Sequence, residues 1–468
     1  FSMTLAASPG FGYSSCVKSK RIAIFGAGLC GLAAARDLVR RGHTVEVYEA
    51  SPIVGGLAAS FRDPDGFAYD NGPRFIFSTL AQKLGILDEC IPVAYYEHIR
   101  VGGKDYRFPF GLMKNLGFSL SAGIATVTRG FRRRPRSLAE FLRTYYGSHF
   151  SSTVLAPLIE KWSGTDSRDM SVDFASRLLP TNLAFIAYSL IKKLRGGITE
   201  DYFKKGRYIV YPRSTNARIF EVLSRGLTIH TNAPLASLDI QGKKIQGAAC
   251  GVHRATADAY LSTIPVSSLL SALPKGSGLE PLAPLSYRSI VVLFLKIARP
   301  KIIDGLWTWF PERRYPFYRI SEYKNALSSM APADKTMLSI EFACQEGDDL
   351  WNRDARSLYE WIQDDLRALY GFDSRDVIEA KLHRSAHAYP VLKKETEATQ
   401  RSMSHTTAIE NLFLAGRTGM FQYKMTEGTY DSAIEAVDLI EAWFDGRDLP
   451  RQDGPQKDRF GRPLVLHE

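Results

Sequence analysis

The sequence predicts an α/β protein built around a parallel sheet of the Rossmann type, and its first fifty residues carry the observations behind that prediction. The apolar run 22–25 has the length and composition of a buried strand. It leads through a G-x-G-x-x-G turn, formed by Gly26, Gly28 and Gly31, into an apolar helix. A second strand then ends at Glu49, 18 residues after Gly31.

Each residue of this turn has a physical reason to be there. Gly26 permits the tight turn, Gly28 lets the backbone approach a pyrophosphate, and Gly31 lets the helix pack closely on the strand. The helix N-terminus offers unpaired N–H groups and partial positive charge. An acidic residue at the spacing of Glu49 accepts hydrogen bonds from ribose hydroxyls. The pattern therefore predicts a bound dinucleotide, with an ordinary glycine-rich turn as the alternative.

The composition bounds the class of protein. The chain has 468 residues, 45% apolar and 23% charged, which is typical of a globular protein of two or three domains. A net charge of +11 favours anionic ligands. Small anionic substrates and membrane surfaces rank above nucleic acid, because no arginine-rich motif with interleaved aromatic residues is present. The five scattered cysteines, without a C-x-x-C pair, argue against disulfides and a zinc site and favour a cytoplasmic location.

The first residues of the chain do not have the pattern of a signal peptide, and we expect both ends to be mobile. Residues 1–19 lack a charged start followed by an apolar core, so we expect a flexible leader. Residues 446–468 are rich in glycine, proline and charge, so we expect a mobile tail. No apolar run reaches the ~18 residues that a membrane span requires.

The chain after Glu49 continues with turns and short elements. Gly55-Gly56 forms a turn that brings backbone N–H groups close to a ligand. Residues 61–69 predict a hairpin, and residues 70–75 a tight loop. Ser137 and Glu140 form a capping box at the start of a helix. The remaining predicted elements are a helix at 79–91, a hairpin of 95–101 with 104–108, a meander of 227–231, 236–240 and 247–253, strands at 258–265, 290–297, 307–310, 317–321, 337–343 and 412–417, and helices at 348–369 and 432–444.

The glycine turn, Glu49 and Gly55-Gly56 together resemble the FAD-binding amine-oxidase superfamily. This group includes monoamine oxidases, protoporphyrinogen oxidase, phytoene desaturases and UDP-galactopyranose mutase. The resemblance implies that Glu49 binds the adenosine ribose and that Gly55, Gly56 and Leu57 lie along the flavin diphosphate. It also implies a non-covalent FAD, because no cysteine lies in the C-terminal segment where monoamine oxidases attach their flavin.

The C-terminal segment, residues 412–428, resembles the segment that lies under the flavin ring in members of the family. The resemblance implies cofactor contacts from Gly416, Arg417, Met425 and Thr426, and from Gly72 in the loop 70–75. It further implies a discontinuous FAD-binding domain beside a mixed α+β substrate-binding domain. The expected pieces are 20–78, 213–285 and 405–445 for the FAD-binding domain, and 79–212 and 286–404 for the substrate-binding domain.

The middle of the chain resembles the mutase branch most closely. Lys161-Trp162 and the stretch 177–180 are similar to its substrate-domain helices, and the stretch 315–324 is similar to its Tyr-Thr-Arg-Ile-x-Glu segment. The resemblance implies that Arg319 clamps a substrate pyrophosphate; the alternative is that Arg319 pairs with Glu322 or another acid. Three features depart from the mutase. Thr181-Asn182 replaces a second clamp, Arg74 replaces a histidine, and Tyr423-Lys424-Met425 replaces Tyr-x-Asp.

Two reactions remain open for a flavoprotein with these residues. The first, which we favour, is hydride transfer from a small or glycosylated metabolite to the flavin; the second is a non-redox nucleotide-sugar mutase. A flavoprotein scaffold without chemistry is a third class. A positive Arg74 or Lys424 would stabilise the reduced cofactor in either reaction. The candidate catalytic residues are Arg74, Arg319, Tyr423 and Lys424, and the candidate substrate-binding residues are Tyr211, Tyr318, Arg319, Tyr389 and Phe421, each aromatic one having a packing role as the alternative.

The segment 129–136 carries five arginines in eight residues. The simplest interpretation is a solvated basic loop. The alternative is contact with anionic lipid or a polyanionic partner, which such a patch favours electrostatically.

Overall fold

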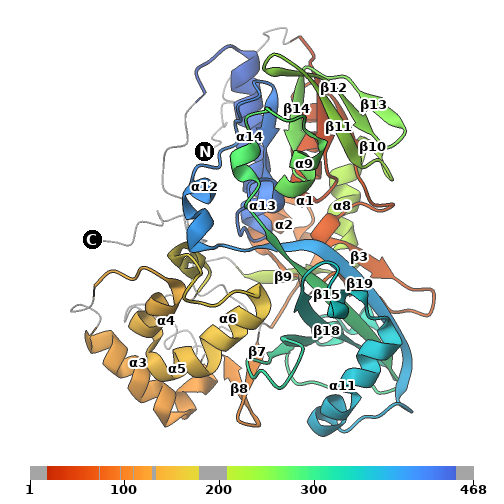
Figure 1. Ribbon diagram of the computed structural model, residues 1–468. Helices are drawn as coiled ribbons and strands as arrows, with labels where there is room; N and C mark the ends of the chain where they lie inside the picture. The colour runs from red at the N-terminus through yellow and green to blue at the C-terminus, as the bar shows by residue number, and fades with distance from the viewer. Residues whose placement is uncertain are drawn as a thin grey trace, which may run out of the picture.

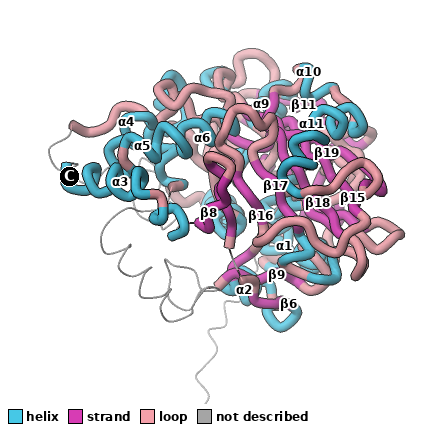
Figure 2. The backbone as a smooth tube through the Cα atoms, turned by 90° about the horizontal axis from the view of Figure 1, so that it is seen from below, coloured by secondary structure: helices cyan, strands magenta, loops and turns pink. Residues whose placement is uncertain are grey.

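The computed structural model describes residues 18–449 except 73, 95, 109, 129–132 and 179–207. A five-stranded parallel sheet lies at the top of Figure 1, and a seven-stranded sheet lies below it. A group of helices stands beside the lower sheet, as the view from below also shows (Figure 2). None of the helices in the described part of the chain is long and apolar enough to cross a bilayer.

The parallel sheet confirms the predicted α/β class. Its strand order is β10-β2-β1-β14-β20. Ile22 and Ile24 of β1 pack against helices α1 and α14 on one face, while Ala23 and Phe25 pack on the other. The elements of this half are β1 (Arg21–Phe25), α1 (Leu29–Arg40), β2 (Thr44–Tyr48), α8 (Ala217–Ser224), β10 (Thr228–His230), β14 (Ala259–Ser262), α9 (Val266–Ala272), β20 (Leu412–Leu414), α13 (Gly416–Gly419) and α14 (Thr426–Phe444).

A three-stranded antiparallel meander covers the second face of the parallel sheet (Figure 1). It consists of β11 (Leu235–Gln241), β12 (Lys244–Cys250) and β13 (His253–Ala255). The prediction that 227–231 belongs to this meander is wrong. Those residues form β10, which pairs in parallel with β2 and so extends the main sheet.

The seven-stranded sheet has the order β19-β15-β18-β17-β16-β7-β8. Helix α11 packs Leu358, Ile362 and Leu366 on one face of it. The predicted helix 348–369 is interrupted at Arg353, where extended backbone separates α10 from α11. The elements here are β7 (Glu97–Val101), β8 (Lys104–Phe108), β15 (Tyr287–Ile297), β16 (Trp307–Trp309), β17 (Arg319–Glu322), β18 (Thr336–Cys344), α10 (Asp349–Asn352), α11 (Ala355–Tyr370) and β19 (Val377–Pro390).

Short elements join the two halves. The segment 76–92 packs into the core beside the parallel sheet together with β9, so the domain boundary expected at residue 79 falls inside this core. These elements are β3 (Ser60–Arg62), β4 (Ala68–Asp70), β5 (Ile76–Phe77), α2 (Ser78–Leu84), β6 (Cys90–Pro92) and β9 (Ile209–Pro212). The other boundaries stay predictions.

The helical group lies at the lower left of Figure 1. It contains α3 (Leu116–Thr128), α4 (Leu138–Tyr146), α5 (Ser148–Phe150) and α6 (Ala156–Ser163). The predicted capping box is present in part at the start of α4, because Ser137 caps the helix but Glu140 accepts from the residue before the cap. The Ser137 hydroxyl accepts from the Glu140 N–H at 3.3 Å, and the Glu140 carboxylate accepts from the Arg136 N–H at 2.8 Å.

Candidate functional site: a dinucleotide cradle beside an arginine and tyrosine cluster

The glycine turn has the geometry that its sequence predicts. Gly26 adopts a φ of +101°, which side chains rarely tolerate. A Cβ at Gly31 would lie 1.9 Å from the Gly26 carbonyl oxygen, so only glycine allows α1 to pack this closely. The Glu49 carboxylate lies at the same turn, because it accepts from the N–H groups of Ala27 at 2.7 Å and Ser51 at 2.9 Å.

The second glycine turn lies against the first. The N–H of Gly55 donates to the Ala27 carbonyl at 2.9 Å, and a Cβ at Gly56 would lie 3.5 Å from the Gly28 Cα. Gly55 has a φ of +115° and Gly56 one of +54°. Two backbone turns free of side chains therefore meet at the N-terminus of α1, where unpaired N–H groups favour phosphate. Leu57 follows, and its carbonyl accepts from Arg74 Nε at 2.7 Å.

The C-terminal segment completes this cradle. Gly416 donates its N–H to the Ser432 hydroxyl at 3.1 Å, and a Cβ there would lie 2.9 Å from the Cys30 Sγ. Glycine at 416 thus lets the segment pass directly over the start of α1. Met425 caps helix α14, which begins at Thr426 rather than at the predicted residue 432.

Arg417 and Tyr423 of this segment lie beside Tyr389 of β19. Arg417 is buried, with 9% of its surface exposed, and donates from Nη2 to the Ala388 carbonyl at 2.8 Å. Its guanidinium lies 4.0 Å from the centre of the Tyr423 ring and 4.8 Å from that of Tyr389. The two tyrosine rings are nearly parallel, at 3° and 5.6 Å, and Trp162 of α6 packs edge-on against both. These four side chains are the arginine–aromatic cluster.

Arg74 adds a second positive charge near this cluster. Burial lowers the pKa of Arg74, and the charge of Arg417 lowers it further. Among the described residues, neither guanidinium forms an ion pair with a carboxylate. The Nε of Arg417 is buried without a hydrogen-bond partner. Two unneutralised cations and an unsatisfied donor beside a side-chain-free cradle fit an anionic cofactor that carries phosphates.

Arg319 has a carboxylate partner. Its Nε and Nη2 donate to the two oxygens of Glu341, both at 2.7 Å, and its guanidinium lies 4.7 Å from the Trp309 ring. Burial acts to lower the pKa of Arg319, but Glu341 raises it well above its usual value. The structure therefore shows the pairing alternative, with Glu341 as the acid. Glu322 instead accepts from the backbone of Ile303 at 2.7 Å.

Three predicted substrate-binding residues are too deeply buried to touch a substrate. Phe421 is 0% exposed and packs on Tyr287 at 5.1 Å. Tyr318 is 0% exposed and donates its hydroxyl to Glu341 at 2.5 Å. Tyr211 is 2% exposed and donates to Asp70 at 2.7 Å. The first fills the core, and the other two satisfy buried carboxylates, so their expected substrate contact is corrected to a supporting role.

Lys424 lies on the cradle side. It is half-buried, a Cβ at Gly428 of α14 would lie 3.5 Å from the Lys424 Cβ, and its charge acts on the Cys30 thiol of α1. Burial raises the pKa of that thiol to about 12, and Lys424 opposes the rise. Thr181-Asn182, which stand where the mutase has its second clamp, lie outside the described residues.

Sequence reasoning missed two buried acids. Glu341 and Asp70 are both 0% exposed. Burial raises the pKa of Asp70 to about 6, while donors such as the Tyr211 hydroxyl act to lower it. The signal for Glu341 was a lone acid within the apolar strand 337–343. For Asp70 it was the first position of the tight loop 70–75. A Cβ at Gly72 of this loop would lie 4.0 Å from the Glu341 carboxylate.

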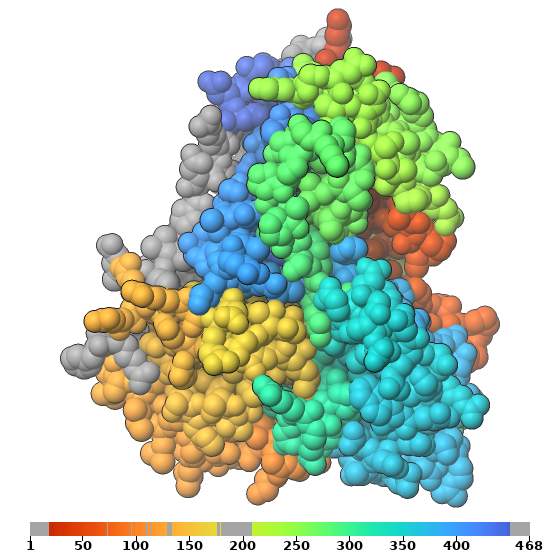
Figure 3. Space-filling view, in the orientation of Figure 1, coloured from red at the N-terminus to blue at the C-terminus, as the bar shows by residue number. Residues whose placement is uncertain are grey.

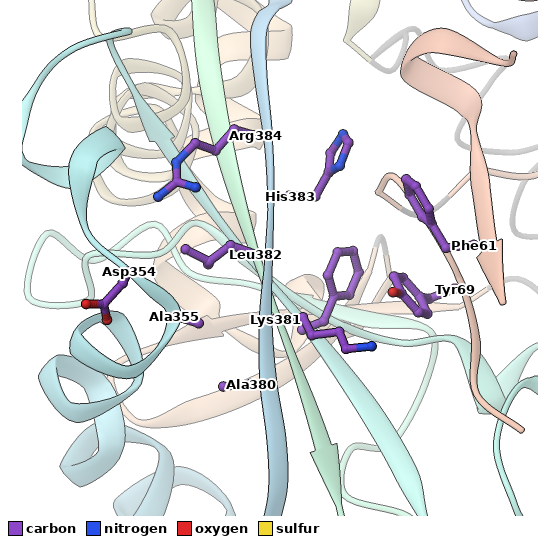
Figure 4. A pocket seen from close by; sticks show the side chains of 10 residues that line it. Phe61, Tyr69, Asp354, Ala355, Ala380, Lys381, Leu382, His383 and Arg384 are labelled. Atoms are coloured by element: carbon purple, nitrogen blue, oxygen red, sulfur yellow. The ribbon is translucent and has the colours of Figure 1, made fainter. Parts of the chain in front are cut away.

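A separate hollow of about 440 Å³ lies at the edge strand β19 (Figure 4). Its lining comes from both faces of that strand, with His383 and Lys381 on one side and Arg384 and Leu382 on the other. Burial lowers the pKa of His383. None of the predicted site residues lines this hollow.

Comparison with known proteins agrees with the cradle. The family model of flavin-containing amine oxidoreductases matches residues 29–440. A probable zeta-carotene desaturase from Synechococcus elongatus is 28% identical over 302 residues, which are 54% of this chain and 60% of that protein. The match thus spans less than two thirds of that relative.

Two solved structures share the fold. A crystal structure of reduced UDP-galactopyranose mutase superposes with a TM-score of 0.75 at 17% identity, covering 93% of this chain and 97% of that one. The crystal structure of a putative protoporphyrinogen oxidase from Exiguobacterium sp. 255-15 superposes with a TM-score of 0.71 at 19% identity, covering 92% of this chain and 100% of that one. The mixed fold of helices and sheets is therefore that of the amine oxidases. The chain belongs to the flavin-containing amine oxidoreductases, and its cofactor is FAD.

Proposed function

We propose that the chain is an FAD-dependent oxidoreductase that takes a hydride from an uncharged, apolar part of its substrate. The observation that carries the proposal is the bidentate pair of Arg319 with Glu341. A nucleotide-sugar mutase requires cationic clamps on the pyrophosphate. A guanidinium whose charge is neutralised by a buried carboxylate is poorly suited to that task, so the mutase is the less favoured reaction.

The cradle residues have separate tasks in this proposal. Gly26, Gly28 and Gly31 would hold the phosphates of a non-covalent FAD at the start of α1, and Glu49 the adenosine ribose. Gly55-Gly56 would lie along the diphosphate. The list of expected cofactor contacts is completed by Leu57, Gly72, Gly416, Arg417, Met425 and Thr426.

The arginine–aromatic cluster would handle charge and solvent. FAD supplies the hydride acceptor when it is bound. Arg74 and Arg417 place fixed positive charge beside the cofactor site, which stabilises negative charge that develops there. Trp162, Tyr389 and Tyr423 pack on one another, and this largely buried aromatic layer would keep water away from the reacting part of the substrate. The identity with a protein named as a carotene desaturase supports an unsaturated, apolar substrate over a glycosylated one.

An anaerobic spectroscopic experiment tests this proposal. The FAD-loaded protein is mixed with a carotene in detergent micelles, and separately, after reduction by dithionite, with UDP-galactopyranose. We expect the polyene to remove the oxidised-flavin absorbance and to gain a double bond. Tyr423→Leu should slow this reaction. Trp361→Leu, which changes an aromatic residue that is 47% exposed on α11, should not.

Three results would contradict the proposal in different ways. Isomerisation of the nucleotide sugar without net oxidation would establish the mutase reaction instead. Retention of FAD without reaction toward either substrate would favour the scaffold class. A protein that takes up no FAD would contradict the cofactor placement itself.

A further inference from the structure

Helix α3 exposes an apolar stripe. Leu116, Leu120, Ile124 and Val127 are 77%, 68%, 61% and 75% exposed. Their spacing of four, four and three residues places them on one face of the helix. Contiguous apolar surface of this kind marks an interaction site in a soluble protein, whereas scattered exposed residues do not.

The opposite side of α3 is firmly packed, so the exposed stripe is not the result of a frayed helix. Phe118 is 4% exposed, and its ring lies 5.2 Å from that of Phe150. The Ser121 hydroxyl accepts from the His149 N–H at 2.9 Å. Helix α3 forms the outer rim of the helical group, at the lower left of Figure 1, and orange spheres from this part of the chain form the corresponding surface in Figure 3.

Basic residues flank the stripe, and no charged residue lies within it. Helix α3 contains no charged residue. Exposed Lys114 precedes the helix, and exposed Arg133, Arg134 and Arg136 follow it. Among the described residues, none of these three arginines forms an ion pair. The sequence adds Arg129 and Arg132 to the same segment, outside the described residues.

We propose that this surface docks on a membrane rich in anionic lipid. We call it the α3 face and define it as Leu116, Leu120, Ile124 and Val127 with the flanking basic residues 114, 133, 134 and 136. A helix of 13 residues is about 20 Å long, less than the ~30 Å hydrocarbon core, so α3 would lie in the membrane plane. The stripe then enters the acyl region, and the basic residues meet the headgroups.

A second copy of the chain fits this face less well. Both ends of the helix are flanked by cations, so a two-fold contact would bring positive side chains against positive side chains in either direction. Anionic headgroups satisfy the same cations. The α3 face is also independent of the proposed reaction, because no residue of it belongs to the cradle or to the arginine–aromatic cluster.

Vesicle co-sedimentation of the FAD-loaded 468-residue chain tests the proposal. We expect binding to phosphatidylcholine vesicles that contain about 30% phosphatidylserine, about tenfold weaker binding to phosphatidylcholine alone, and weakening by salt. The double variant Leu120→Glu/Ile124→Glu should bind about tenfold more weakly than the wild type. The matched control is Val252→Glu, at a valine that is 97% exposed between β12 and β13 and that should bind normally.

The design separates docking from misfolding. FAD content and circular dichroism report folding, and the milder Leu116→Ser/Val127→Ser replaces the first variant if that one does not fold. Unchanged binding by the folded stripe variants, or no binding by the wild type, would overturn the proposal. A wild-type dimer that the stripe variant converts to a monomer, without vesicle binding by either, would assign the face to a second copy.

Discussion

Glu341 holds the Arg319 guanidinium in the core, and replacing Glu341 by glutamine should destabilise the protein strongly. The carboxylate is 0% exposed and accepts two guanidinium N–H groups, each at 2.7 Å, as well as the Tyr318 hydroxyl. Glutamine keeps the shape but removes the charge. Its amide N–H₂ group, itself a donor, would also face the donors of Arg319 or Tyr318. A buried charge left without its partner costs about 3 to 5 kcal/mol, and we expect Glu341→Gln to lower the free energy of unfolding by that amount.

Equilibrium unfolding in urea measures this loss, with tryptophan fluorescence and flavin release as the two signals. Arg319→Met alone should cost a similar amount. The double variant Arg319→Met/Glu341→Leu should recover most of the loss, because no buried charge remains. Glu360→Gln is the control, because it breaks the exposed pair with Arg356 on α11 and should not change stability measurably.

Two outcomes would refute this reasoning. One is a loss below about 1 kcal/mol for Glu341→Gln, since that is the range of a solvent-exposed pair. The other is a double variant no more stable than either single variant, which would mean that volume and shape, and not the isolated charge, cause the loss.

Three further predictions concern the cradle, a buried acid and a buried lysine. Gly31→Ala should abolish FAD retention on gel filtration, because the new Cβ would lie 1.9 Å from a backbone oxygen. The control is Gly123→Ala, where no atom lies within 4 Å of the new Cβ. A Gly31→Ala protein that retains its full FAD content would contradict the prediction. The folded pKa of Asp70, about 6, lies above its unfolded value, so its contribution to stability is present below about pH 4 and lost as the pH rises through 6. Between about pH 4 and pH 6 the free energy of unfolding of the wild type should fall by about 2 to 3 kcal/mol relative to that of Asp70→Asn. If the difference in unfolding free energy between the two proteins did not change with pH, the pKa of Asp70 would not be raised. Lys161→Met should lower the free energy of unfolding by about 2 to 4 kcal/mol, because the ammonium donates to the backbone carbonyls of Phe310, Glu312 and Tyr315 at 2.6 to 2.9 Å; an unchanged urea midpoint would contradict this.

The glycine cradle could be predicted because its requirements are local. A positive φ at Gly26 and a close helix approach at Gly31 are properties of a few consecutive residues. The position of Glu49 could be predicted equally well, because a β-α-β unit has a narrow range of lengths. The roles of these residues toward FAD remain predictions that the ligand-binding experiments address.

The register of a distant strand could not be predicted in the same way. Arg319 and Glu341 are directly opposite in the antiparallel pairing of β17 with β18. Sequence proximity suggested Glu322, but successive side chains along a strand point to opposite faces, and an offset of three residues places Glu322 on the other one. The same limit explains β10, whose short apolar pattern fits both the meander and the edge of the parallel sheet.

The sequence by itself determined the fold class, the glycine cradle, and the basic composition of the segment after α3. Local backbone geometry and residue type decide these features, and both can be read along the chain. Only the tertiary structure decided that Arg319 is neutralised, that Tyr211, Tyr318 and Phe421 are buried, and that the apolar stripe of α3 is exposed. The physical reason is that charge pairing and burial depend on which elements meet in space, and those contacts join residues separated by tens to hundreds of positions.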